Sequence, residues 1–169
     1  ADDFYRRSLA NRRAALGPDH PHEAFSHNGQ SEEARARGRL ARSDSLHRDA
    51  LDLRRRRLGA EHPDVAHSLG GLARTALALG SATLAEDHLR EALRIREQGL
   101  GPDHPSTAEV ELTLAELLLE AGRTEEAVSL ARSAAPTFEA RFGPEDPRTE
   151  RARRLLEGGS EDPEAAGSD

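Results

Sequence analysis

The chain has 169 residues, a net charge of −7, a mean hydropathy of −0.74 and only 3 % aromatic residues, which favours a thin core of Ala and Leu over a thick globular one. Cysteine and lysine are both absent, which excludes disulfides, thiolate metal sites, cysteine nucleophiles, P-loop lysines and Schiff-base lysines. The acidic total disfavours a nucleic-acid partner, and no apolar run reaches the ~20 residues of a membrane span, so we expect a cytoplasmic protein.

The first predicted element, residues 1–20, ends in a motif that returns along the whole chain. The motif reads Leu-Gly-Pro-Asp-His-Pro from residue 16 and recurs in closely similar form from residues 58, 100 and 142, always 42 residues apart. A fixed period of this kind indicates a repeat architecture. Each motif glycine suits a helix end that needs a left-handed residue, and each final proline suits the first turn of the next helix. A further glycine lies midway in each repeat, at Gly38, Gly80 and Gly122, and predicts two helices per repeat.

The period divides the chain into six predicted segments. Complete repeats need two helices each, so the ends of the chain hold incomplete ones. Residues 1–20 form a partial repeat that contains only its second helix, and full repeats follow at 21–62, 63–104 and 105–146. A short capping helix at 147–157 precedes an acidic tail at 158–169 that is predicted to be disordered.

Two of the predicted helices contain residues that weaken a helix. The first helix of the second segment, residues 21–37, carries polar His27, Gln30 and Ser31 where the next repeat has apolar residues, and we expect it to be frayed or distorted. Gly29 costs this helix up to ~1 kcal/mol more. In the repeat at 105–146, Pro136 lies inside the second helix and predicts a kink there.

The best copy of the packing pattern is Leu69, Leu72-Ala73, Ala76, Gly80, Ala85, Leu89 and Ala92. It resembles the tetratricopeptide repeat, in the 42-residue form typical of kinesin light chains and many bacterial multidomain proteins. The resemblance implies an all-α fold, a right-handed superhelical solenoid of antiparallel helix pairs, and a role in protein–protein interaction. Many such repeats carry an Asn pair that clamps a bound peptide; the matching positions here are Asn28-Gly29, Gly70-Gly71 and Leu112-Thr113, so only Asn28 agrees. The Arg-rich, Lys-free composition suggests a bacterial gene.

By the same resemblance, the first helices of the repeats would line a concave groove that holds a partner peptide or protein. The groove would be mixed in charge at its N-terminal end and acidic at its C-terminal end, so we expect a partner with basic residues there and salt-sensitive binding. The predicted groove residues are Asn28, Arg35, His67, Arg74, Glu109, Thr113, Glu116 and Glu120.

Other functions were weighed against this one. His20, His62 and His104 recur at the repeat period, which favours a role in the turn over metal binding. The run Arg54-Arg55-Arg56-Arg57 lies in the last turn of a predicted helix, where cations complement the helix dipole. This structural role is favoured over a nucleic-acid-binding patch, because successive residues face different directions. No residue is nominated as catalytic, and no cofactor or metal is expected. The leading interpretation is a protein-interaction scaffold; the alternative is a regulatory or oligomerisation extension of a larger bacterial enzyme such as a Ser/Thr protein kinase.

Overall fold

The computed structural model describes residues 22–158, together with isolated positions 4, 7, 10, 11, 14 and 20. Within 22–158 the chain forms seven α-helices and no strand, as the all-α prediction requires. Its contacts divide the chain into two units, residues 1–99 and 100–169. The predicted partial repeat at 1–20 lies outside the described residues apart from those isolated positions, and the predicted acidic tail lies outside them after Gly158.

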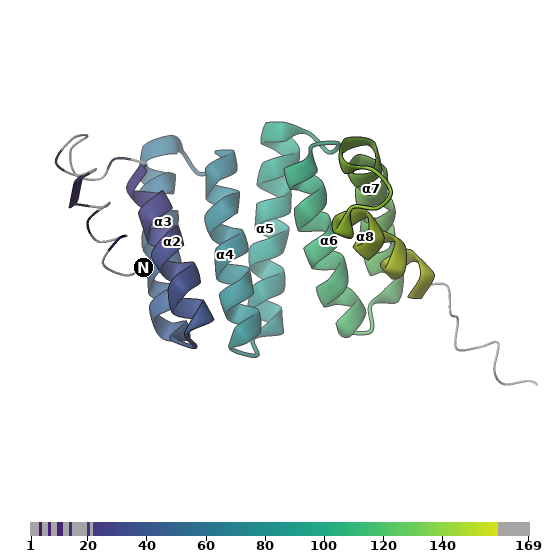
Figure 1. Cartoon of the computed structure of the whole chain (residues 1–169), viewed down its shortest axis with the longest axis horizontal. Helices are drawn as coiled ribbons and strands as arrows, with labels where there is room; N and C mark the ends of the chain where they lie inside the picture. The colour runs from purple at the N-terminus through teal and green to yellow at the C-terminus, as the bar shows by residue number, and fades with distance from the viewer. Residues whose placement is uncertain are drawn as a thin grey trace, which may run out of the picture. The chain divides into compact units, whose positions relative to one another are not determined.

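The described part of the first unit, from residue 22 onward, contains four helices joined by short turns (Figure 1). They are α2 (His22–Ala36), α3 (Leu40–Leu58), α4 (Pro63–Ala78) and α5 (Ala82–Leu100), of which the last residue falls at the boundary between the units. Helix α3 packs against both α2 and α4. The core is thin and aliphatic, as composition suggested, and includes Ala24, Ala50, Leu53, Leu69, Leu72, Ala73, Ala85, Leu89 and Ile95.

The second unit contains α6 (Pro105–Glu120), α7 (Thr124–Phe142) and α8 (Pro147–Gly158). Helix α6 packs against α7, and α8 packs against both. Helix α7 continues through Pro136 to its end, so the proline does not terminate it, and the kink expected there stays a prediction. The buried residues of this unit include Leu112, Leu114, Leu118, Ala127, Ala131, Ala134, Phe138, Ala152 and Leu155.

The midway glycines end the first helix of each pair by one shared geometry. At Gly80, φ is 75°, its N–H donates to the Leu77 carbonyl at 2.9 Å, and the Ser81 N–H donates to the Ala76 carbonyl at 2.8 Å. This pair of bonds is the Schellman motif, which satisfies carbonyls that the helix end leaves free and needs a residue with positive φ. Gly38 and Gly122 repeat it with φ of 70° and 76°.

The motif glycines adopt a different conformation from the left-handed helical one that the sequence suggested. Gly59 has φ 91° and ψ 156°, and Gly143 has φ 88° and ψ 171°. The positive φ was foreseen, but the extended ψ places both residues in a region that only glycine occupies readily. The chain therefore leaves the helix in an extended direction and turns into the next one.

The histidines of the motif cap the helices that follow them. The Nδ1 atom of His62 accepts a hydrogen bond from the Asp64 N–H at 3.1 Å, and that of His104 accepts from the Ser106 N–H at 3.1 Å. In the last copy Asp146 Oδ1 accepts from the Arg148 N–H at 3.0 Å. An acceptor at this position satisfies one of the free N–H groups of the first turn. The turn role expected for these two histidines is confirmed.

Helix α2 corrects one prediction. The helix at residues 21–37 was expected to be frayed or distorted, yet it runs unbroken from His22 to Ala36, so the expected fraying is wrong over these residues. Its buried polar residues differ in their hydrogen bonding: Asn28 Nδ2 and Gln30 Nε2 have no hydrogen-bond partner among the described residues, whereas Ser31 is bonded to α3. The Ser31 hydroxyl lies 2.8 Å from both the carbonyl and the hydroxyl oxygen of Ser43, whose hydroxyl lies 3.0 Å from that of Thr75. A buried polar group costs little once it is hydrogen-bonded, so this polar seam replaces the apolar contacts of the next repeat.

Candidate partner-binding surface

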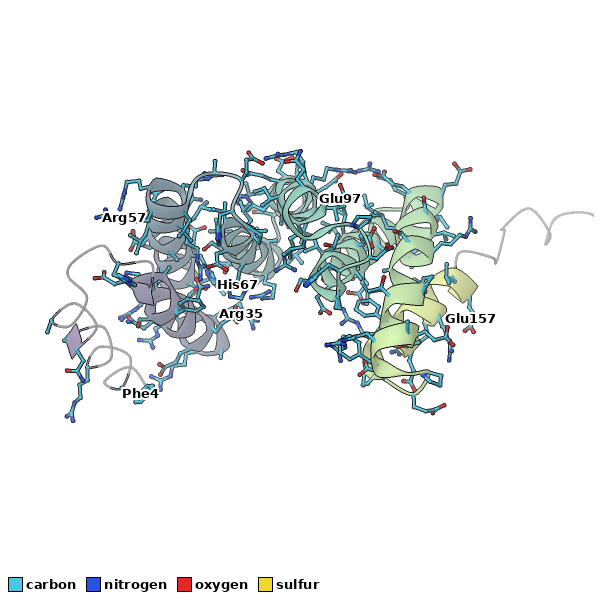
Figure 2. The ribbon with its side chains drawn as sticks, turned by 90° about the horizontal axis from the view of Figure 1, so that it is seen from above. Phe4, Arg35, Arg57, His67, Glu97 and Glu157 are labelled. Carbon is cyan, nitrogen blue, oxygen red and sulfur yellow. The ribbon has the colours of Figure 1, made fainter. Side chains whose placement is uncertain are left out.

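The eight predicted groove residues fall on the first helix of each pair. Four lie in the first unit and four on α6 in the second. Figure 2, seen from above, labels Arg35 near the end of α2, His67 in the first half of α4, and Arg57 near the end of α3. The first-unit surface comprises Arg35, His67 and Arg74 together with Glu32; the second-unit surface comprises Glu109, Thr113, Glu116 and Glu120 together with Arg151.

Glu32 is the centre of the first-unit surface. Its carboxylate pairs with Arg35 on the same helix at 2.9 Å and with Arg74 of α4 at 2.6 Å. Partial burial acts to raise the pKa of Glu32, but the hydrogen bonds and charges of Arg74 and Arg35 outweigh it and hold the pKa below its ordinary value. Two predicted groove residues, Arg35 and Arg74, are thus already engaged, and the Glu32–Arg74 pair links α2 to α4.

His47 lies beneath Glu32 and is almost fully buried. Its Nε2 is 3.8 Å from the Glu32 carboxylate, yet burial lowers the pKa of His47 to about 4, and the charges of Arg74, His67 and Arg54 add to that effect against the opposing pull of Glu32. The ring is therefore neutral at neutral pH, and its contact with Glu32 is not an ion pair under those conditions.

Two further groove predictions concern residues beside His47. Asn28 is buried rather than turned to solvent, with Oδ1 3.4 Å from Nδ1 of His47. Its side chain therefore belongs to the interior of the first unit. His67 is exposed; partial desolvation and the nearby Arg54 and Arg74 lower its pKa.

The glycine pair of α4 explains how a histidine fits inside this unit. A Cβ atom on Gly71 would lie 2.2 Å from Cε1 of the His47 ring. No side chain can occupy that position while the ring is in place. The neighbouring Gly70 would meet only the end of Arg74, at 3.9 Å. Gly71 occupies a position where many such repeats carry an Asn of the peptide-binding pair. Here the missing side chain leaves space for the His47 ring.

In the second unit a basic residue already lies over the acidic face. Arg151 of α8 donates to Glu116 through Nε at 2.9 Å and Nη2 at 2.7 Å, and its Nη1 lies 4.0 Å from Glu109. The Thr113 hydroxyl donates to the backbone carbonyl of Glu109 at 2.9 Å. Glu120 is exposed and forms no ion pair among the residues that the structure describes.

The sequence contains a pattern of charges, 42 residues apart, that predicts ion pairs of this kind. Positions 32, 74 and 116 are equivalent in the repeat and carry Glu, Arg and Glu; positions 67, 109 and 151 are equivalent and carry His, Glu and Arg. Adjacent copies of one position lie on neighbouring first helices in a stacked repeat, so alternating charge predicts pairing between them. Reading charges down the period would have found Glu32 with Arg74.

The arginine run in α3 does not form a basic patch. Arg54 is buried and donates to the Ser68 hydroxyl at 2.5 Å, whereas Arg55 pairs with Glu91 of α5 at 2.7 Å. Arg56 and Arg57 are exposed in the last turn. Successive residues of a helix face different directions, and here they meet different surroundings. Among the residues described, His, Asp and Glu form no group of three that could hold a metal ion.

Paired helices with Gly and Pro at a fixed period, stacked through small residues, define an α-helical repeat protein of the kind that presents surfaces to other proteins. Models of the tetratricopeptide repeat match residues 34–98, 76–140 and 1–22. The chain belongs to the tetratricopeptide repeat family. No match was found among curated proteins.

Solved structures share the fold. The nearly identical TPR-like repeats named for a kinesin light chain of Podosopora anserina are 22 % identical, with a TM-score of 0.72 over 94 % of this chain and 75 % of that one. BtubC (BKLC) from P. vanneervenii is 21 % identical, with a TM-score of 0.82 over 99 % of this chain and 65 % of that one. Such likeness shows a common fold and leaves function to be argued from the surfaces. None of the helices described is both long and apolar enough to cross a membrane.

Proposed function

We propose that this chain is a protein-interaction module that binds a segment of a partner protein on the first helices of its repeats, and that basic residues of the partner bind the second-unit surface. The observation that supports this is the position of Arg151, whose guanidinium lies at 2.7 Å from Glu116 and 4.0 Å from Glu109. A partner arginine offers the same planar set of donors to the same carboxylates.

Glu120 extends this acidic surface toward the end of α6. It is exposed and has no ion pair among the described residues, so it is open to a cation. A bound segment with two basic residues would engage Glu120 with one and compete with Arg151 for Glu116 with the other. Exposed charge pairs of this kind are screened by salt, so binding should weaken as ionic strength rises.

The experiment starts by identifying the partner. A photo-crosslinking amino acid at Thr113, which is half-buried on α6 between Glu109 and Glu116, is introduced into the full-length protein in its host, and the captured protein is purified. Its affinity is then measured for the unmodified chain and for the triple variant Glu109→Gln, Glu116→Gln, Glu120→Gln. We expect a loss of ~tenfold or more at low salt and a smaller loss at high salt.

A matched control has the same change of net charge at exposed carboxylates elsewhere: Glu97→Gln, Glu125→Gln, Glu145→Gln. It should bind as the unmodified chain does. Equal binding by the first triple variant at low salt would disprove the proposal. The alternative interpretation, a regulatory extension of a larger bacterial enzyme, stays a prediction, as do the bacterial origin, the cytoplasmic location and the repeat boundaries at 21–62, 63–104 and 105–146.

A further inference from the structure

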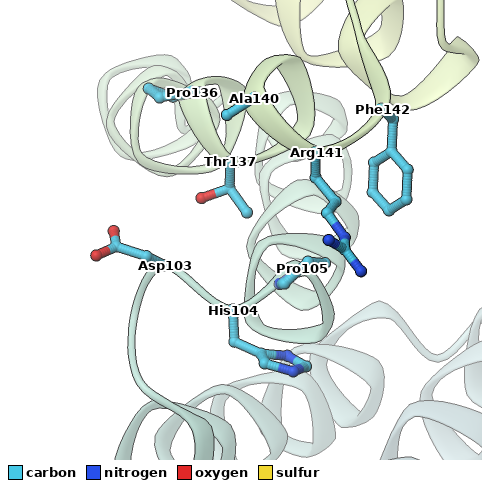
Figure 3. A pocket seen from close by; sticks show the side chains of 8 residues that line it. All are labelled: Asp103, His104, Pro105, Pro136, Thr137, Ala140, Arg141 and Phe142. Carbon is cyan, nitrogen blue, oxygen red and sulfur yellow. The ribbon is translucent and has the colours of Figure 1, made fainter.

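A pocket of about 770 Å³ lies within the second unit, between the turn that precedes α6 and the C-terminal half of α7 (Figure 3). Pockets that bind ligands typically have volumes of ~300–1,000 Å³. None of its residues belongs to the second-unit surface described above. The lining residues are Asp103, His104 and Pro105 from the turn, and Pro136, Thr137, Ala140, Arg141 and Phe142 from α7.

The equivalent junction in the preceding repeat is held by an ion pair and a close contact. There Arg94 of α5 donates to both oxygens of Glu61, in the turn before α4, at 2.5 and 3.1 Å. A Cβ atom on Gly99 would lie 2.9 Å from Cγ of Pro63, so the end of α5 is in close contact with the start of α4. An ion pair and a close backbone approach at Gly99 thus join the two elements.

The second unit has lost both features. Residues Asp103, Pro136 and Arg141 stand 42 positions after Glu61, Arg94 and Gly99. Pro136 has no charged group and cannot form an ion pair with Asp103. Arg141 has a side chain at the position where Gly99 makes its close contact by having none. The junction therefore cannot close in the same way, and the pocket is a consequence of these two replacements.

The polar groups of the pocket are mostly donors. Arg141 and Asp103 form no ion pair among the residues described. Nδ1 of His104 accepts from the Ser106 N–H, which leaves the proton of the neutral ring on Nε2 as a donor. Thr137 adds a hydroxyl. Figure 3 shows Thr137 toward the Asp103 end and Arg141 beside Phe142, so positive and negative charge lie at opposite ends.

The remaining lining is apolar. Pro105, Pro136 and Ala140 present only carbon side chains, and Phe142 is 37 % exposed. The ring is fixed on one side by Arg148, whose guanidinium carbon lies 3.5 Å from the ring centroid. An exposed aromatic in a pocket whose other apolar lining residues are Pro105, Pro136 and Ala140 suits an apolar side chain from another molecule, because covering it removes apolar surface from water.

We propose that this pocket binds a short linear segment of a partner protein in which an apolar side chain stands next to an acidic one. The apolar side chain lies against Phe142, the carboxylate pairs with Arg141, and Asp103 at the other end favours a basic residue further along the segment. Charge complementarity selects this occupant, since a purely basic segment would meet Arg141 unfavourably. The pocket is a docking site separate from the second-unit surface and does not depend on it.

The test selects peptides from a random library displayed on phage against the full chain, with counter-selection against the variant Ala140→Glu. Ala140 is exposed, and glutamate suits a helix while it fills and acidifies the pocket. We expect enriched peptides to pair an apolar residue with an acidic neighbour. A synthetic peptide of the enriched sequence should lose affinity ~tenfold or more with Ala140→Glu and with Arg141→Gln.

Two controls separate this result from other causes. Ala82→Glu makes the same change at an exposed position of α5, and the triple Glu→Gln variant of α6 removes the carboxylates of the second-unit surface; both should bind the peptide as the unmodified chain does. Circular dichroism checks the fold of each variant. If Ala140→Glu does not fold, the peptide affinity of Arg141→Gln alone tests the proposal. Absence of enrichment, enriched peptides without an acidic residue, or binding unchanged by Arg141→Gln would each overturn the proposal.

Discussion

Arg151 of α8 holds both carboxylate oxygens of Glu116 of α6, through Nε at 2.9 Å and Nη2 at 2.7 Å. The two residues are 35 positions apart and lie on helices that pack against one another. A charge of the chain itself therefore occupies part of the acidic face that the proposed partner would use. The strength of partner binding should depend on this internal competitor.

Replacing Arg151 by Gln should strengthen the binding of a basic partner, because Glu109 and Glu116 are then free to bind it. The cost in folding stability should be modest, ~0.5–1 kcal/mol, since both side chains are about one third exposed. Titration calorimetry with the captured partner measures the first effect and urea unfolding the second. Arg153→Gln, which removes a pair with Glu139 on α7, serves as the control and should leave affinity unchanged. Weaker binding by the Arg151 variant would contradict the competition.

Gly71 and Gly70 are adjacent and should respond oppositely to alanine. Gly71→Ala places a Cβ atom 2.2 Å from the His47 ring and should destabilise the protein by ~2–4 kcal/mol. Gly70→Ala meets only the flexible end of Arg74 and should stabilise the helix by ~0.5–1 kcal/mol. Urea unfolding of the two variants measures both effects. Similar stability for the two would show that the ring does not pack against α4.

His47 should make the protein less stable in acid. Its pKa is about 4 in the folded state against an ordinary 6.5, so between these pH values the unfolded chain binds more protons than the folded one. The stability from a neutral His47 is fully present above pH 6.5 and is lost as the pH falls toward 4, to an extent on the order of 3 kcal/mol. Unfolding measured across this range should show a smaller pH dependence for His47→Gln. An unchanged slope would contradict this assignment.

His104 should be replaceable by aspartate but not by alanine. His104→Ala removes the acceptor for the Ser106 N–H and should cost ~1 kcal/mol. His104→Asp should keep the stability close to that of the unmodified chain, because Asp146 fills the equivalent position and accepts from Arg148. Thermal or urea unfolding measures both. Equal losses for the two variants would show that the imidazole contributes something other than the cap.

Helix boundaries could be predicted from the sequence because the groups that end a helix lie within a few residues of it. The repeated Gly and Pro placed α4, α5, α6 and α7 between the expected punctuation marks, and the motif histidines were correctly assigned to turns. Even here the structure changed the detail, since the ψ angle of Gly59 is extended.

The sequence alone determined the fold class and the helix pairs, because punctuation acts locally and repeats at a constant period. Tertiary structure decided which polar residues are buried with partners and which charges are already paired. Ser31 is polar where the next repeat is apolar, and only the structure shows its hydrogen bond to Ser43, whose hydroxyl is in turn bonded to Thr75. Likewise only the structure shows that Glu116 is paired with Arg151. The energy of a polar or charged group depends on neighbours that are distant along the chain, and only folding brings those neighbours together.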